Sequence, residues 1–232
     1  MGKILFDLPA TPLVPVAGSE DLFPVNRIFC VGRNYEDHAK EMGAAVDREA
    51  PVYFTKPASA VVLSGGTIPY PPGTTNFHYE MELVVAIDKP AFRVGVDEAL
   101  NSVFGYACGL DMTRRDLQQY AKDRRYPWDI AKAFENSAII TPITPVEEFG
   151  AVNDQHIWLK LNNETKQSSH LNAQIWSVEE IISHLSHYYH LTAGDLIYTG
   201  TPAGVGAVKS GDIITGGIDR LSPLVIEIGN AE

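Results

Sequence analysis

Apolar residues in this chain gather in short runs that glycine and proline separate. Alternation and β-branched residues within these runs predict strands. The predicted strands span residues 27–31, 52–54, 80–87, 103–110, 156–161, 196–199, 212–215 and 224–228. Asn162 and Asn163 stand between two strand-like runs and suit a type I′ hairpin, because asparagine tolerates the positive φ of that turn. The pattern is therefore mostly β.

Capping residues and periodicity predict helices between some of these strands. The first spans about residues 35–42, with Asn34 as its N-cap and Gly43 at its C′ position. The second starts at Thr113, where Thr-Arg-Arg-Asp resembles a capping box, and ends near residue 123. The third follows.

This third helix is expected at residues 178–189, after a capping box formed by Ser177 and Glu180. Strands outnumber the helices and do not alternate regularly with them, which excludes a doubly wound Rossmann or flavodoxin sheet. The sequence therefore predicts an α+β fold that is mainly β.

Length and composition are those of an ordinary globular protein. The 232 residues are 45% hydrophobic and 20% charged, enough to bury a sizeable core in one domain. We expect an N-terminal extension over residues 1–24 and a single domain over residues 25–232. Cys30 and Cys108 lack CxxC spacing and are predicted to be buried thiols.

The charge balance excludes several classes of partner. Lysine and arginine total 18 against 29 acidic residues, a net charge of −11, so no broad basic surface exists to bind nucleic acid. Prolines interrupt the N-terminal segment, which does not resemble a signal peptide, and the apolar runs fall short of the roughly 20 residues of a membrane-spanning helix. We therefore expect a cytoplasmic protein without membrane contact.

Positive charge is concentrated locally in one place. Charge patterning favours a solvated helix face over a binding site there. The residues concerned are Arg114, Arg115, Lys122, Arg124 and Arg125.

Acidic residues at residues 80–87 are candidates for a metal site. Glu80 and Glu82 are two apart on a predicted strand, so they share a face with Cα atoms roughly 7 Å apart. A half-exposed edge strand is the simpler interpretation. The alternative is a hard divalent cation, which takes oxygen ligands and offsets the repulsion between the carboxylates. Asp111, at the end of another predicted strand, is the candidate for a third ligand. The residues alone leave both interpretations open, the edge strand and the metal site.

His38 and Glu41 form a second constellation, three residues apart on the first predicted helix. At that spacing the carboxylate can orient the imidazole so that it activates water. The alternative is a charged surface helix with an incidental ion pair. The glycine-rich residues 199–206 match neither a P-loop nor GxGxxG; they form either a plain turn or a loop that presents N–H groups to a carboxylate.

Taken together and in order, these segments resemble the fumarylacetoacetate hydrolase family, specifically its small acylpyruvate hydrolase branch. The similarity runs from about residue 27 to residue 228. The segments that carry it are Val-Gly-Arg-Asn-Tyr at 31–35 with Asp37 and His38, Tyr-Phe-Thr-Lys-Pro at 53–57, Glu-Met-Glu-Leu at 80–83, Gly-Leu-Asp-Met-Thr-Arg-Arg-Asp-Leu-Gln at 109–118, Pro-Trp at 127–128, Lys-Ala-Phe at 132–134, and Thr-Gly-Thr-Pro at 199–202 with Gly-Val-Gly at 204–206.

The resemblance implies a fold and a set of site residues. The fold is a mixed β-sandwich roll of the type found in the C-terminal domain of that family, and the domain over residues 25–232 is then catalytic. The residue matches assign Mg²⁺ or Mn²⁺ to Glu80, Glu82 and Asp111; catalysis to His38, Glu41 and Lys132; and substrate binding to Arg33, Lys56, Arg115, Gln118 and Thr201. One departure is visible, because relatives often carry His-His where this chain has His78-Tyr79.

The activity implied is metal-dependent hydrolysis of a carbon–carbon bond in a 3-acylpyruvate. Similarity to one subgroup favours fumarylpyruvate, the gentisate-pathway intermediate, as the substrate that yields fumarate and pyruvate. Three alternatives stay open: a general acylpyruvase, an oxaloacetate decarboxylase or tautomerase, and a metal domain that binds an organic acid without turnover. The family also implies a homodimer whose small-molecule partner is a 2-oxo acid.

Overall fold

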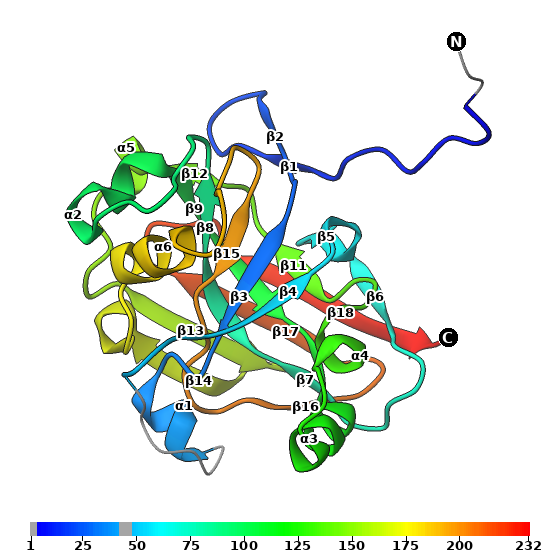
Figure 1. Cartoon of the computed structure of the whole chain (residues 1–232). Coiled ribbons are helices and arrows are strands. Elements are labelled where there is room, and N and C mark those ends of the chain that lie inside the picture. Colours follow the sequence, from blue (N-terminus) through cyan, green and yellow to red (C-terminus); the bar gives the residue numbers. More distant parts are fainter. Residues whose placement is uncertain (1–3, 42–47) are drawn as a thin grey trace.

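The computed structural model of the chain describes residues 4–41 and 48–232. Figure 1 shows curled sheets wrapped around one another, with short helices at their edges. The largest sheet has the order β4-β3-β15-β8-β9-β11-β5, with β12 paired to β9. Its strands are β3 (Ile28–Gly32), β4 (Val52–Lys56), β5 (Val61–Leu63), β8 (Met81–Ile87), β9 (Val103–Asp111), β11 (Ala138–Ile140), β12 (Thr144–Pro145) and β15 (Leu196–Tyr198).

The other strands form two smaller sheets and a hairpin. One sheet has the order β14-β13-β17-β18-β6 and another the order β10-β7-β16, while β1 pairs with β2. These strands are β1 (Leu13–Pro15), β2 (Leu22–Pro24), β6 (Thr67–Tyr70), β7 (Phe77–Tyr79), β10 (Thr113–Arg114), β13 (His156–Leu161), β14 (Glu164–His170), β16 (Gly206–Val208), β17 (Ile213–Ile218) and β18 (Leu224–Ala231).

The helices are short and lie at the periphery. They are α1 (Glu36–Glu41), α2 (Val96–Ala99), α3 (Arg115–Arg124), α4 (Asp129–Lys132), α5 (Val146–Phe149) and α6 (Val178–Ser186), with 3₁₀ turns η1 (Ala58–Ala60), η2 (Leu100–Ser102) and η3 (Leu171–Ala173). Among the described residues, no helix is long and apolar enough to cross a membrane. The architecture confirms the α+β, mainly β fold.

Strand β8 lies at the centre of the molecule and is buried along its whole length. It pairs with β15 on one side and with β9 on the other. Its side chains alternate between two apolar clusters: Leu83 and Val85 pack into one, while Val84 and Ala86 pack into the other. A strand buried on both faces reads as a continuous apolar run, which explains residues 83–87. The alternative of a half-exposed edge strand is therefore wrong.

Two predicted helix caps are wrong. The first helix begins at Glu36, and Asn34 is not its cap: the buried Asn34 amide accepts from Trp176 N at 2.7 Å and donates to Thr199 O at 2.8 Å. These bonds tie α1 to distant segments, which a local capping rule does not consider. The predicted end of this helix, including Gly43, lies outside the described residues.

The second helix begins at Arg115 because Thr113 and Arg114 form β10, which pairs with β7. Asp116 forms no capping box, since its carboxylate accepts from Thr74 Oγ1 at 2.5 Å and Thr75 N at 3.0 Å. The reciprocal capping box of Ser177 and Glu180 on α6 is confirmed.

Other local expectations are confirmed. Asn162 and Asn163 have φ values of 50° and 67° between β13 and β14, as a type I′ hairpin requires. Cys30 and Cys108 are buried free thiols.

The N-terminal region is divided in two. Val14 and Phe23, on the β1–β2 hairpin, are buried in the apolar cluster that also holds Val84 and Ala86. The segment before it, including the exposed Ile4 and Phe6, runs away from the body in Figure 1. The domain boundary between residues 24 and 25 stays a prediction.

Candidate active site

Strand pairing brings the three predicted carboxylates together. Glu82 lies opposite Gly109 in the antiparallel pair of β8 and β9, so Asp111 lies opposite Glu80, and Asp111 N donates to Glu80 O at 2.9 Å. Positions 80 and 82 share one face of the chain, and residue 111 lies on the same side. Oxygen atoms of Glu80, Glu82 and Asp111 all lie within 4.8 Å of one another, and all three residues are buried.

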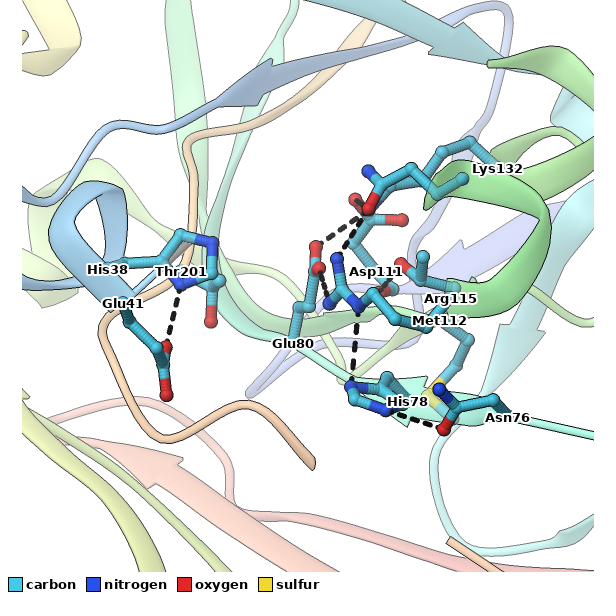
Figure 2. Close-up of polar contacts among 12 residues, drawn as sticks. His38, Glu41, Asn76, His78, Glu80, Asp111, Met112, Arg115, Lys132 and Thr201 are labelled. Atoms are coloured by element: carbon cyan, nitrogen blue, oxygen red, sulfur yellow. Dashed lines mark hydrogen bonds and ion pairs between the residues drawn. The ribbon is translucent and has the colours of Figure 1, made fainter. Parts of the chain in front are cut away.

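Cations surround two of these carboxylates. Lys132 Nζ lies 2.7 Å from Glu80 Oε2 and 2.6 Å from Asp111 Oδ2, and Figure 2 shows it reaching both acids. Lys56 Nζ lies 2.8 Å from Asp111 Oδ1. Arg115 donates to Glu80 Oε1. These contacts neutralise Glu80 and Asp111, whereas Glu82 accepts only a backbone bond among the described residues, from Gly200 N at 2.8 Å.

The pKa values follow from this unequal pairing. Burial alone would raise the pKa of Glu80, but the charges of Lys132 and Arg115 outweigh it and hold the pKa well below its usual range. Burial raises the pKa of Glu82 well above its usual range, and the charges of Asp111 and Glu80 raise it further. Among the described residues Glu82 forms no ion pair, so it has less compensating positive charge than Glu80 or Asp111.

The donor set fits a hard divalent cation. Carboxylate oxygens are the ligands that Mg²⁺ and Mn²⁺ prefer, and a dication beside Glu82 would supply the missing positive charge. Asp111 Oδ1 accepts no hydrogen bond from the described residues, although the Lys56 ammonium is close to it. The three residues predicted as metal ligands are thus placed as a metal site requires.

His38 and Glu41 face this cluster from α1. His38 is buried and lines the same cavity as Glu80 and Glu82. Its Nδ1 lies 3.1 Å from Glu41 Oε2, and Figure 2 shows the pair across the cavity from Glu80. This contact leaves Nε2 of the imidazole free of Glu41. Because His38 is buried beside the carboxylates, the pair does not lie on a fully solvated helix face, and the role of His38 as a base stays a prediction.

The glycine-rich loop at residues 199–206 presents N–H groups to carboxylates, as one of the two interpretations predicts. Gly200 N donates to Glu82, and Gly204 N donates to Glu41 Oε1 and Oε2 at 3.1 and 3.2 Å. Both glycines have positive φ, at 99° and 97°, and a Cβ on Gly204 would lie 2.0 Å from Lys166 O. Only glycine fits such positions. The loop thus links the carboxylate cluster to α1.

Four of the predicted substrate-binding residues line the cavity, namely Arg33, Arg115, Gln118 and Thr201. Gln118 Oε1 accepts from Arg115 at 2.6 Å, and Thr201 Oγ1 accepts from Gln167 Nε2 at 2.8 Å. Arg33 is exposed and has a φ of 60°. The prediction for Lys56 requires correction, because its side chain is 0% exposed and its ammonium contacts Asp111 and two backbone carbonyls beneath the cavity. Lys56 positions Asp111.

Sequence reasoning missed other residues around the cavity. Lys122, Phe54 and Trp128 line it. The basic cluster is only in part a solvated face, since Arg115 is buried against Glu80. The spacing of Arg115, Gln118 and Lys122 at i, i+3 and i+7 on one helix face was the available signal.

His78 and Gln167 support the site from outside the cavity. Arg115 Nε donates to His78 Nδ1 at 3.3 Å, and burial together with the charge of Arg115 lowers the pKa of His78 to about 4. His78 is therefore neutral and available as an acceptor. Gln167 bonds both Met81 N and Thr201 Oγ1, so it ties the loop to β8. Nothing in the sequence around Gln167 indicates this role.

Comparison with known proteins gives consistent matches. A family model described as fumarylacetoacetate (FAA) hydrolase C-terminal matches residues 27–229. A fumarylpyruvate hydrolase from Ralstonia sp is 52% identical over 194 residues, covering 82% of this chain and 100% of the relative. The mitochondrial oxaloacetate tautomerase of Homo sapiens is 41% identical over 205 residues, covering 88% of this chain and 92% of that protein. A crystal structure of fumarylpyruvate hydrolase from Pseudomonas aeruginosa in complex with Mn²⁺ and pyruvate superposes with a TM-score of 0.96 at 44% identity, covering 99% of this chain and 100% of the other.

Proposed function

Because this chain belongs to the fumarylacetoacetate hydrolase family, we propose that it is a metal-dependent hydrolase that cleaves fumarylpyruvate to fumarate and pyruvate. Such an enzyme acts on a carbon–carbon bond in a ketonic substance. The observation that carries the proposal is that His38, held by Glu41, lines one cavity with Glu80 and Glu82, beside which Asp111 completes a cluster of carboxylates. The cavity therefore combines a metal site with a base for water.

The substrate is anchored by its 2-oxo acid end. Arg115, Gln118 and Thr201 line the cavity beside the carboxylate cluster, and their donors suit a carboxylate and a carbonyl oxygen. A Mg²⁺ or Mn²⁺ ion held by Glu80, Glu82 and Asp111 would supply electrophilic polarisation of these substrate oxygens. The relative solved with Mn²⁺ and pyruvate supports this assignment.

Water activation falls to His38. Glu41 accepts a hydrogen bond from the protonated Nδ1 of His38, so Nε2 is free to take a proton from water as the water oxygen attacks the distal carbonyl carbon. Lys132 donates to the oxygen that gains negative charge. The bond between C3 and C4 then breaks, its electron pair is protonated at C3 to give pyruvate, and C4 becomes a carboxylate of fumarate. One water is consumed.

The test is product analysis in ¹⁸O-enriched water with Mn²⁺ present. The proposal predicts fumarate that carries one ¹⁸O atom in a carboxylate, and no product when a chelator is added. Turnover that releases no fumarate, or turnover that persists with the chelator, would overturn it.

Oxaloacetate tautomerisation is a second candidate, because the human relative with 41% identity carries that name. Tautomerisation moves a proton within the substrate and consumes no water. It therefore needs the carboxylate cluster but not the pair of His38 and Glu41. Two results together would favour this candidate. The wild type would be inactive on fumarylpyruvate, and a His38→Ala variant would still tautomerise oxaloacetate.

The family resemblance extends the proposal to a cytoplasmic homodimer that serves the gentisate pathway of aromatic catabolism. Light scattering of the purified protein tests the dimer, since a mass near twice 25.4 kDa is expected and a mass of one chain would contradict it.

A further inference from the structure

Two cations at the cavity form no ion pair with the described residues. Lys122 and Arg33 both line the cavity, and within residues 4–41 and 48–232 neither side chain forms a hydrogen bond or ion pair. By contrast, Arg115 and Lys132 in the same cavity are bonded to Glu80. Lys122 is half-buried, and its ammonium lies 5.5 Å from the ring centroid of Trp128. A partly buried, unpaired cation is costly unless an anion joins it.

The charged groups around Lys122 leave its ammonium without an ion-pair partner among the described residues. Burial and the charges of Arg115 and Arg33 lower the pKa of Lys122 to about 8. Glu80 is the acid that acts on it, and that carboxylate is already engaged by Lys132 and Arg115. An anion held between Lys122 and Arg33 would offset both the burial and the repulsion between the cations.

Residues of helix α3 line the cavity one after another along the helix axis. Arg115, Gln118 and Lys122 occupy one face at i, i+3 and i+7, so Lys122 lies about 10 Å along the helix from Arg115. Phe54 and Trp128 form the apolar wall beside them. The cavity therefore presents an acidic cluster with Arg115, then an apolar wall, and then a second pair of cations.

We propose that Lys122, with Arg33, binds the distal carboxylate of the substrate, so that the enzyme selects dicarboxylic over monocarboxylic 2-oxo acids. This inference rests on the proposed function, because it places the 2-oxo acid end at Arg115 and the carboxylate cluster. Fumarylpyruvate has a carboxylate at each end, about 8 Å apart when extended.

The test compares two unreactive ligands of equal chain length. The ligands are 2-oxoheptanoate and 2-oxoheptanedioate, which differ only in the distal carboxylate. Calorimetry on the Mn²⁺-loaded protein measures the affinity of each. A charge-assisted contact predicts that wild type prefers the dicarboxylate by about 10- to 100-fold. Lys122→Met removes most of this preference, Arg33→Gln removes part of it, and Lys122→Arg retains it.

Arg124→Gln is the matched control, since Arg124 is an exposed cation on the same helix whose guanidinium lies over Tyr120. It leaves both affinities unchanged. Monocarboxylate binding in each variant reports whether the cavity is intact. Equal affinity of wild type for the two ligands, or an equal loss of both affinities in Lys122→Met, would overturn the inference. Failure of wild type to cleave fumarylpyruvate would contradict the proposed function while leaving this preference measurable.

Discussion

The two sides of the cavity are built differently. The cavity floor, defined as Glu80, Glu82 and Asp111, is formed by β8, by β9 and by the residue directly before β8. Both strands lie inside the largest sheet with partners on both sides. The α1 wall, defined as His38 and Glu41, belongs to a helix of 6 residues. An isolated helix of that length is unstable in water, so α1 depends on contacts such as Glu41 with Gly204 and the bridge between Tyr35 and Gln174.

This difference separates two parts of the chemistry. The floor is fixed by strand register and by ion pairs with Lys132, Lys56 and Arg115, and every reaction of a metal-bound 2-oxo acid needs it. The α1 wall supplies only the base for water. Changes to the floor should abolish all activities, whereas changes to the α1 wall should abolish hydrolysis alone.

The largest effect is expected from Glu82→Gln on the floor. Loss of a ligand should abolish Mn²⁺ binding and reduce every activity by roughly 10⁴-fold, because the ion contributes several kcal/mol. The metal-free fold should survive: Glu82 has a raised pKa, so the free energy of unfolding falls as pH rises above 4.5, and glutamine removes that penalty. Calorimetry with Mn²⁺ and thermal unfolding check both parts.

Asp111→Asn is the informative contrast, since it leaves the buried Lys56 without a carboxylate partner and leaves Lys132 paired with Glu80 alone. It should lower the metal-free melting temperature where Glu82→Gln does not. Equal melting temperatures would show that the ion pairs of the floor do not stabilise the fold.

His38→Ala changes the α1 wall. Loss of a general base should reduce fumarylpyruvate hydrolysis by about 10²- to 10⁴-fold, while Mn²⁺ affinity stays within about threefold of wild type. Steady-state assays and metal titration measure the two quantities. His187→Ala, at an exposed histidine after α6, is the control and should match wild type. Unchanged turnover in His38→Ala would remove His38 from the mechanism.

Glu41→Gln is a milder change to the same wall. Glutamine can still accept from Gly204 N but does not orient His38 through a charge, so hydrolysis should fall about 10- to 100-fold, the loss usual for a partner that orients a functional histidine. The KM for fumarylpyruvate should stay near that of wild type. A rise in KM without loss of kcat would indicate that Glu41 shapes the cavity instead.

The smallest effect is a pH dependence at Lys122. Its pKa is lowered to about 8 by burial and by the charges of Arg115 and Arg33, with Glu80 and Lys132 as the other charged groups that act on it. Below pH 8 the ammonium is charged, so kcat/KM for fumarylpyruvate should decline as pH rises through 8, by at most about tenfold per pH unit. Acetylpyruvate, which lacks a distal carboxylate, should not show this decline. Parallel profiles for both substrates would contradict the role of Lys122.

Most of the fold that positions the site was predictable. The continuous apolar run after Glu82 and the alternation before it indicate β8, and the same rule places β9 before Asp111. What the residues alone left open was whether Glu80, Glu82 and Asp111 meet, because strand pairing is a long-range choice that periodicity does not encode. Ordered resemblance to a family supplied that step.

The errors share a physical cause, namely side chains that bond outside their own element. Asn34 and Asp116 match local capping rules, but their side chains form hydrogen bonds with distant partners, Trp176 and Thr74. Lys56 matches a substrate-binding position in sequence, yet it is buried beneath Asp111. Charge patterning places Lys122 on a solvated face, because the cavity that it lines is formed by residues distant in the sequence.

The most direct test is pyruvate release from fumarylpyruvate, acetylpyruvate and oxaloacetate, measured in parallel with Mn²⁺ and with a chelator. The floor and the α1 wall together predict release from fumarylpyruvate that the chelator abolishes, and the distal cations Lys122 and Arg33 predict that it exceeds release from acetylpyruvate. Reaction of oxaloacetate alone would leave the metal site of the floor intact but would contradict the hydrolytic role of His38 and Glu41.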